Sequence, residues 1–169
     1  MVEEVVHDIP EPVKPEITIL VPTWNRHKFL DLFVLNLKNQ DYPHNKLKVI
    51  IDDDGSEKFI TDENELNGVK QFLHPIQIKY INNRPRRTIG KKRNQLYLPT
   101  YISHSYEVMQ KTKSNCVGSD KMLFCMTDRN FDIHAINCGN TKKLIHEATL
   151  MFKVKWFKAS CGFADSSQG

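Results

Sequence analysis

The stretch at residues 47–56 constrains the fold of this chain more than any other. A mostly apolar, β-branched run ends at three consecutive carboxylates, Asp52 to Asp54, and a Gly-Ser turn follows. Runs of this kind are typical of strands buried on both faces in parallel α/β sheets. An unpaired buried carboxylate is costly, so we expect the acids at the carboxyl end of the strand, where open α/β sheets bind ligands. The alternative is an acidic turn that caps a following helix.

A second stretch of the same kind covers residues 17–26. Its apolar run is followed by Pro22, which cannot donate to a central ladder and is expected to break the strand. A polar loop with Trp24 and Arg26 comes next. Two parallel strands joined by a helix place both following loops on the same sheet edge. An aromatic face, an arginine and carboxylates on one edge suit a nucleotide.

The order of elements predicts an α/β fold in one domain. The first half reads β-α-β-α-β, which favours a Rossmann-like parallel sheet, and the second half is mixed. We expect a nucleotide-binding half over residues 1–96 and an acceptor-side half over 97–169. The expected strands lie at 17–22, 47–52, 76–81, 122–126 and 131–136 and near Val117; the expected helices lie at 27–40, 61–73 and 100–113; residues 127–130 form a hairpin turn; and 150–156 is a strand or a helix.

Composition narrows the classes of function. No apolar run approaches the roughly 20 residues that cross a bilayer, and the N-terminus lacks the pattern of a signal peptide, so we expect a cytoplasmic protein without a transmembrane segment. The four cysteines include no C-x-x-C pair and are interpreted as reduced structural thiols. The net charge of +4 is too small to indicate nucleic acid by itself.

Residues 84–94 form the most basic stretch, with six cationic side chains. Three interpretations stay open: a solvated loop, a contact with a pyrophosphate or acidic substrate, and a nucleic-acid contact. Arginine presents a fork that matches phosphate oxygens. Because no aromatic residues are interleaved to stack on bases, we expect no nucleic-acid partner.

Several of these segments together resemble the family 2 glycosyltransferases of GT-A fold. The resemblance is carried, in order, by I-L-V-P-T-W-N-R at 19–26, N-Q-D-Y-P at 39–43, V-I-I-D-D-D-G-S at 49–56 and G-K-K-R-N at 90–94. Residues 100–119 and 157–169 resemble the later part of such domains. The sequence pattern is similar to that of glycosyltransferases encoded by large DNA viruses. Such an origin would place the protein in the host cytoplasm.

The resemblance implies a role for individual residues. Asp54 matches the carboxylate that accepts from the imide N–H of uracil, and Arg93 matches a residue near the donor diphosphate. The remaining residues implied in nucleotide and donor binding are Pro22, Thr23, Trp24, Asn25, Arg26, Asp53 and Lys92. Two alternatives stay open, since Trp24 can be a core residue and Asp53 can cap the next helix.

The chain departs from the family pattern in two places. After residue 96 the family supplies a helix, a strand and a D-x-D-type cluster that holds a divalent metal, whereas this chain passes directly to Tyr97. We expect a segment that carries the metal ligands to be missing from this sequence at that point. The family's acidic general base is expected just beyond Gly169, with Asp165 as a weaker candidate.

The resemblance therefore implies an inverting glycosyltransferase that uses a UDP-sugar with Mn²⁺ or Mg²⁺ and acts on a glycan, protein or lipid acceptor. The alternative is a catalytically inactive sugar-nucleotide or glycan-binding module. Metal-dependent turnover of a UDP-sugar separates the two.

The basic stretch yields a test of the arginine that the resemblance singles out. A bidentate arginine loses its geometry even when changed to lysine, whereas diffuse attraction to nucleic acid depends on total charge and salt. We predict that Arg93→Lys impairs UDP-sugar turnover more than the combined Arg86→Gln and Arg87→Gln change, measured at one ionic strength. Greater damage from the double change, with a parallel fall in RNA binding, would assign the stretch to another partner.

Overall fold

The computed structural model of the chain describes residues 13–57, 63–83, 98–126, 132–137, 145 and 149–160. Its three-stranded sheet consists of β1 (Ile17–Thr23), β2 (Leu47–Asp53) and β3 (Gln77–Asn82). The connections carry η1 (His27–Phe29), α1 (Leu30–Lys38), η2 (His44–Lys46) and α2 (Glu63–Leu73). The later elements are α3 (Tyr101–Thr112), β4 (Cys116–Val117), β5 (Lys121–Met126), β6 (Asp132–Asn137), β7 (Met151–Phe152) and α4 (Val154–Ala159).

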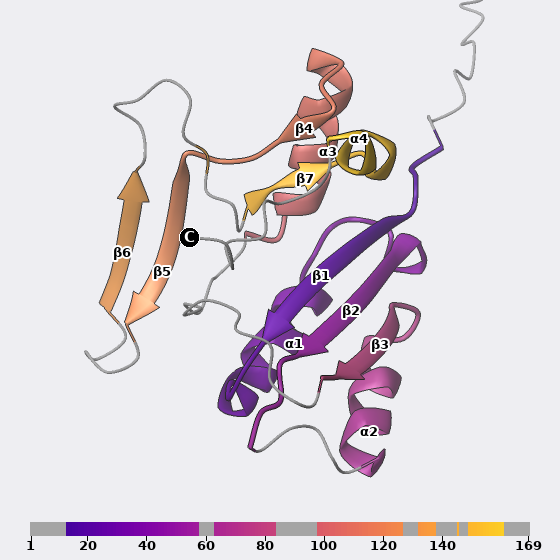
Figure 1. Cartoon of the computed structure of the whole chain (residues 1–169), viewed down its shortest axis with the longest axis vertical. Coiled ribbons are helices and arrows are strands. Elements are labelled where there is room, and N and C mark those ends of the chain that lie inside the picture. Colours follow the sequence, from indigo (N-terminus) through magenta and orange to yellow (C-terminus); the bar gives the residue numbers. More distant parts are fainter. Residues whose placement is uncertain are drawn as a thin grey trace, which may run out of the picture.

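The first half forms the predicted β-α-β-α-β unit. Both strand pairs are parallel in the order β1-β2-β3, and the register places Ile19 beside Val49 and Val49 beside Ile78. All three arrows in Figure 1 point the same way, so the carboxyl ends of the strands share one edge of the sheet. The loops that follow β1 and β2 meet there, as the sequence predicts.

Only one face of this sheet is fully covered among the described residues, which corrects the expectation of a strand buried on both faces. Side chains along β2 alternate between buried and half-buried, and Leu20 on β1 is exposed. Two crossovers of the same hand that step in one direction along a sheet place both helices on the same face. Accordingly α1 and α2 contact each other behind the sheet (Figure 1).

Pro22 lies inside β1 and does not break it. The strand continues to Thr23, and Pro22 stands in register with Asp52. Within the described residues β1 is at the edge of the sheet, where a missing N–H donor is tolerated. The predicted break was therefore wrong because it assumed a central position for this strand.

The core extends from the sheet to α3 through Tyr42. This side chain is buried, its hydroxyl donates to the Pro15 carbonyl at 2.7 Å, and its ring meets Tyr106 edge to face at 6.1 Å. Burial, with Tyr106 nearby, raises the pKa of Tyr42 to about 12. The hydroxyl therefore stays protonated and keeps donating at neutral pH.

The second half is mixed, as predicted. β5 and β6 form an antiparallel hairpin, and β4 pairs with β7. Residues 150–156 hold both a short strand and the start of a helix, so neither expected alternative describes them alone. Cys116 is a free thiol and is not part of a disulfide. Of the helices that the structure describes, none combines the length and the apolar character needed to span a membrane.

Two leucines on α1 test the location of the core. Leu37 is 5% exposed and belongs to the core cluster, whereas Leu35 is 51% exposed on the same helix. We predict that Leu37→Ala lowers the free energy of unfolding by about 2–5 kcal/mol and that Leu35→Ala lowers it by about 0.5 kcal/mol or less. Urea denaturation measures both, and equal losses would contradict the assigned core.

Candidate functional site

The candidate site consists of two loops at the carboxyl edge of the sheet. The first loop, residues 24–26, follows β1, and the second loop, residues 54–57, follows β2. The Asn25 N–H donates to Ser56 Oγ at 2.7 Å, and the Glu57 N–H donates to Asn25 Oδ1 at 2.8 Å. The backbone of each loop is thus hydrogen-bonded to a side chain of the other, which fixes their relative position.

Asn25 bridges the loops in a left-handed backbone conformation. Its φ is 51°, a region that asparagine adopts more readily than most residues with a side chain. The two hydrogen bonds to the second loop use its N–H and its side-chain oxygen. Asn25 was predicted as a nucleotide contact, and the structure adds this loop-bridging role.

The Asp53 side chain accepts hydrogen bonds that stabilise the turn of the second loop. It is 2% exposed, its Oδ1 accepts from Ser56 N at 2.9 Å and from Ser56 Oγ at 2.6 Å, and its Oδ2 accepts from the Tyr80 hydroxyl at 2.5 Å. Gly55, with φ of 75°, makes the turn that returns Ser56 to this carboxylate. These bonds compensate the buried charge, so Asp53 supports the turn.

Asp54 is the next residue and is 0% exposed. Its N–H donates to the Thr23 carbonyl at 2.9 Å, which extends the pairing of β1 and β2 beyond the strands. A nucleobase therefore reaches this carboxylate only if the surface over it opens.

The end of β3 completes this edge. The Asn83 N–H donates to the Asp53 carbonyl at 2.8 Å, and the Asn83 side-chain amide donates to Asp52 Oδ1. Each of the three consecutive carboxylates thus has a different environment.

The first loop carries the aromatic and cationic groups of the site. Trp24 is 36% exposed, which leaves part of its ring accessible for stacking. The half-buried Arg26 has its guanidinium carbon 5.8 Å from the centre of the Phe29 ring. Pro22 is exposed just before this loop. The loop thus presents an aromatic face beside a cation.

Other predicted site residues lie outside the described part of the chain. These are Lys92, Arg93 and Asp165, together with the basic stretch at 84–94 and the junction at 96–97.

The structure also adds residues that sequence reasoning missed. Tyr80 and Ser56 are bonded to Asp53, and His27 Nε2 lies 2.9 Å from Glu65 Oε1, which joins η1 to α2. The signals that could have found them are the D-D-G-S pattern, which contains Ser56, and the alternating third strand, which contains the phenol of Tyr80. For the His27–Glu65 pair we find no sequence signal, because its partners are 38 residues apart.

A metal site does not form within the described residues. They contain no group of three or more His, Cys, Asp or Glu side chains that could hold an ion, and both oxygens of Asp53 already accept hydrogen bonds. The residues present therefore do not fit a divalent cation, and its ligands would have to come from other parts of the chain.

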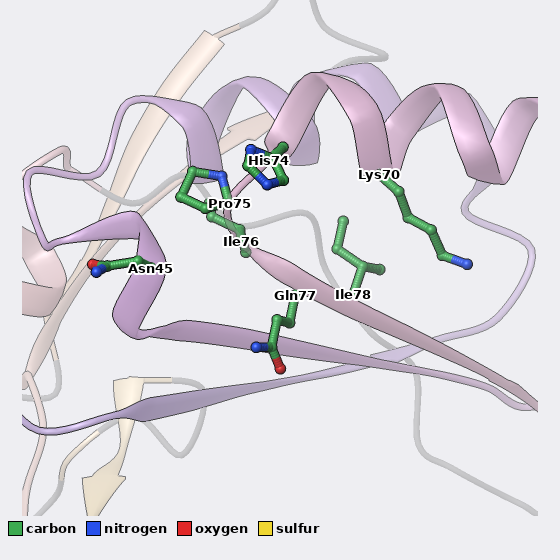
Figure 2. Close-up of a pocket in the computed structure, with 7 residues that line it drawn as sticks. All are labelled: Asn45, Lys70, His74, Pro75, Ile76, Gln77 and Ile78. Carbon is green, nitrogen blue, oxygen red and sulfur yellow. The ribbon is translucent and has the colours of Figure 1, made fainter.

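A hollow of about 570 Å³ lies at the opposite end of β3 (Figure 2). Because residues 76–78 at the start of the strand line it, it is separate from the two loops at the strand ends. Its lining residues are Asn45, Lys70, His74, Pro75, Ile76, Gln77 and Ile78.

A parallel sheet with polar loops at its carboxyl edge is a Rossmann-like arrangement, in which ligands bind at that edge. Comparison with family models makes the assignment narrower, since the model described as "Glycosyl transferase family 2" matches residues 18–97, which run from β1 past β3. Over these residues the chain is similar to glycosyltransferase family 2, and its fold is the GT-A fold.

A solved structure supports the fold assignment. The mannosyltransferase PcManGT from Pyrobaculum calidifontis, in complex with GDP-Man and Mn²⁺, is similar with a TM-score of 0.62 at 17% sequence identity. The match covers 90% of this chain and 48% of that one, so this chain spans about half the length of the mannosyltransferase. At this identity the likeness shows the fold alone. A comparison with curated proteins found no match.

The loop bridge can be tested at Ser56, whose buried hydroxyl links Asn25 to Asp53. We predict that Ser56→Ala lowers the free energy of unfolding by about 1–3 kcal/mol, because the Asn25 N–H loses this acceptor and the buried Asp53 carboxylate loses one of the hydrogen bonds to its charge. Ser103→Ala is the control, since its more exposed hydroxyl also makes two bonds, to Asp41 and to the Thr100 carbonyl. Equal losses in urea denaturation would contradict a buried bridge.

Proposed function

We propose that this chain belongs to an inverting glycosyltransferase that moves a sugar from a UDP-sugar to a hydroxyl of a glycan, protein or lipid. One observation carries the proposal: the family match at 18–97 coincides with the sheet whose two loops are fixed to each other at the carboxyl edge. Loops that are hydrogen-bonded to each other suit nucleotide binding, because less conformational freedom is lost when the ligand binds.

Recognition of the base is assigned to Trp24 and Asp54. The accessible part of the Trp24 ring offers a stacking surface, and the Asp54 carboxylate accepts the imide N–H of uracil. A hydrogen bond to a charged group contributes about 1.5–3 kcal/mol, which favours uracil over cytosine, because cytosine has no donor at that position. Since Asp54 is buried in the ligand-free structure, the proposal requires the surface over it to open when the nucleotide binds.

Guanine is the second candidate base. It also carries a ring N–H that a carboxylate can accept, and the similar mannosyltransferase was solved with GDP-Man. Arg26 is the described cation of the first loop, and we assign it to the donor phosphates together with Lys92 and Arg93.

The chemical step in the proposal is general-base catalysis. A carboxylate deprotonates the acceptor hydroxyl as it attacks the anomeric carbon, and the nucleoside diphosphate leaves from the opposite side. We assign the base to Asp165 or to a residue beyond Gly169. Mn²⁺ or Mg²⁺ belongs to the proposal because the similar mannosyltransferase contains Mn²⁺. The described residues offer no ligands for the ion, so the proposal places its ligands in other parts of the chain.

The role of Asp54 is tested by binding. We predict that Asp54→Asn weakens UDP binding at least about tenfold, the loss expected when one charged acceptor is removed. Asp52→Asn is the matched control and changes the affinity less than about twofold, since Asp52 is bonded to Asn83 and not assigned to the base. Calorimetric titration with UDP, GDP and CDP measures both variants, and equal UDP affinities for wild type and Asp54→Asn would remove Asp54 from the site.

Turnover separates an enzyme from a binding module. We predict that a preparation of the complete protein releases UDP from a UDP-sugar in the presence of Mn²⁺ and loses this activity when EDTA removes the ion. Sugar nucleotides with other bases and sugars serve as controls for donor choice. Tight UDP binding without turnover of any donor, with or without metal, would favour the inactive binding module.

A further inference from the structure

We infer that Tyr80 is a positioning residue that holds both loops of the candidate site through Asp53. The inference rests on the proposed function only in its consequence for nucleotide binding. Tyr80 lies on β3 in register with Ile51, one position before the residue that pairs with Asp52. Its ring packs against the core cluster, while its hydroxyl reaches the Asp53 carboxylate at 2.5 Å.

The hydrogen bonds that start at Tyr80 have one possible direction. The phenol donates to Asp53 Oδ2, and Asp53 Oδ1 accepts from the Ser56 hydroxyl at 2.6 Å. The single proton of that hydroxyl is thereby directed to the carboxylate, so its oxygen lone pairs are left to accept. Ser56 Oγ accepts from the Asn25 N–H at 2.7 Å. A contact made on β3 thus holds the carboxylate to which the Ser56 hydroxyl donates, and Ser56 in turn accepts from the first loop.

Removing the Tyr80 hydroxyl would release one end of this carboxylate. Asp53 Oδ2 would lose its described donor in a buried position, and the carboxylate would turn or take up water to replace it. Either response weakens the bonds from Oδ1 to Ser56, and through Ser56 the tie to Asn25. The sheet itself should persist in Tyr80→Phe, because the ring and the ladder between β2 and β3 are unchanged.

The chain offers a matched control for this change. The Tyr42 hydroxyl also makes a hydrogen bond from a core ring, to the Pro15 carbonyl at 2.7 Å. Pro15 precedes β1, so this bond lies toward the amino end of the sheet, away from the two loops. Tyr42→Phe therefore removes the same group from the same core without touching the loop network.

The experiment is amide hydrogen exchange measured by NMR on the ligand-free protein, followed by UDP titration. In Tyr80→Phe we expect the amides of Asn25, Ser56 and Glu57 to exchange about three- to tenfold faster, the change that corresponds to losing one net hydrogen bond. The amides of α3 should stay unchanged. In Tyr42→Phe the three loop amides should exchange as in wild type. UDP affinity should fall about three- to tenfold in Tyr80→Phe only, in line with the looser loops.

The outcomes are distinguishable. Unchanged exchange at the three loop amides in Tyr80→Phe, or equal acceleration throughout the protein in both variants, overturns the positioning role. Faster loop exchange with unaltered UDP affinity overturns its link to nucleotide binding. If wild type binds neither UDP nor GDP, the proposed function fails, and hydrogen exchange still decides whether Tyr80 holds the loops.

Discussion

The carboxylate of Asp53 is the group on which the rest of the site depends. A charge this deeply buried is stable only when donors surround it, and they come from a residue on β3 and from the turn that follows β2. Because these donors belong to separate segments, compensating the charge also fixes the segments to each other. The first loop joins the same arrangement through Asn25. Compensation of one buried charge therefore also links the end of β3 to both loops of the site.

The sheet makes this arrangement possible because its strands are parallel and in close register. Thr23, Asp53 and Asn82 lie side by side at the strand ends, so the loops after them start from one line. Both crossover helices, α1 and α2, lie behind the sheet and contribute residues to the core between them and the strands (Figure 1). The helices stabilise the strands by burying apolar surface, and they leave the carboxyl edge to polar side chains.

The fold of the first half could be predicted from the sequence because its signals are local. Apolar runs located each strand of the sheet within one residue, and the intervening helical spacing predicted the parallel order. The covered face and the continuation of β1 past Pro22 to Thr23 could not be predicted, since both depend on the position of a strand in the sheet. The role of Asp53 was open for a similar reason: the tyrosine that binds it is 27 residues away in sequence. Loop positions follow from local pattern, but the use of each side chain depends on contacts between distant segments.

The three adjacent acids, Asp52 to Asp54, show how such contacts give similar residues different tasks. Side chains alternate along a strand, so Asp52 and Asp53 point to opposite faces, and their like charges are kept apart. Asp52 is paired with Asn83, and Asp53 with Tyr80 and Ser56. Asp54 follows the strand, where its N–H is tied to Thr23. The sheet thus fixes the backbone of Asp54, while Asp53 stabilises the turn. The carboxylate assigned to the base therefore need not also support the loop, and base recognition and loop support can change independently at adjacent positions.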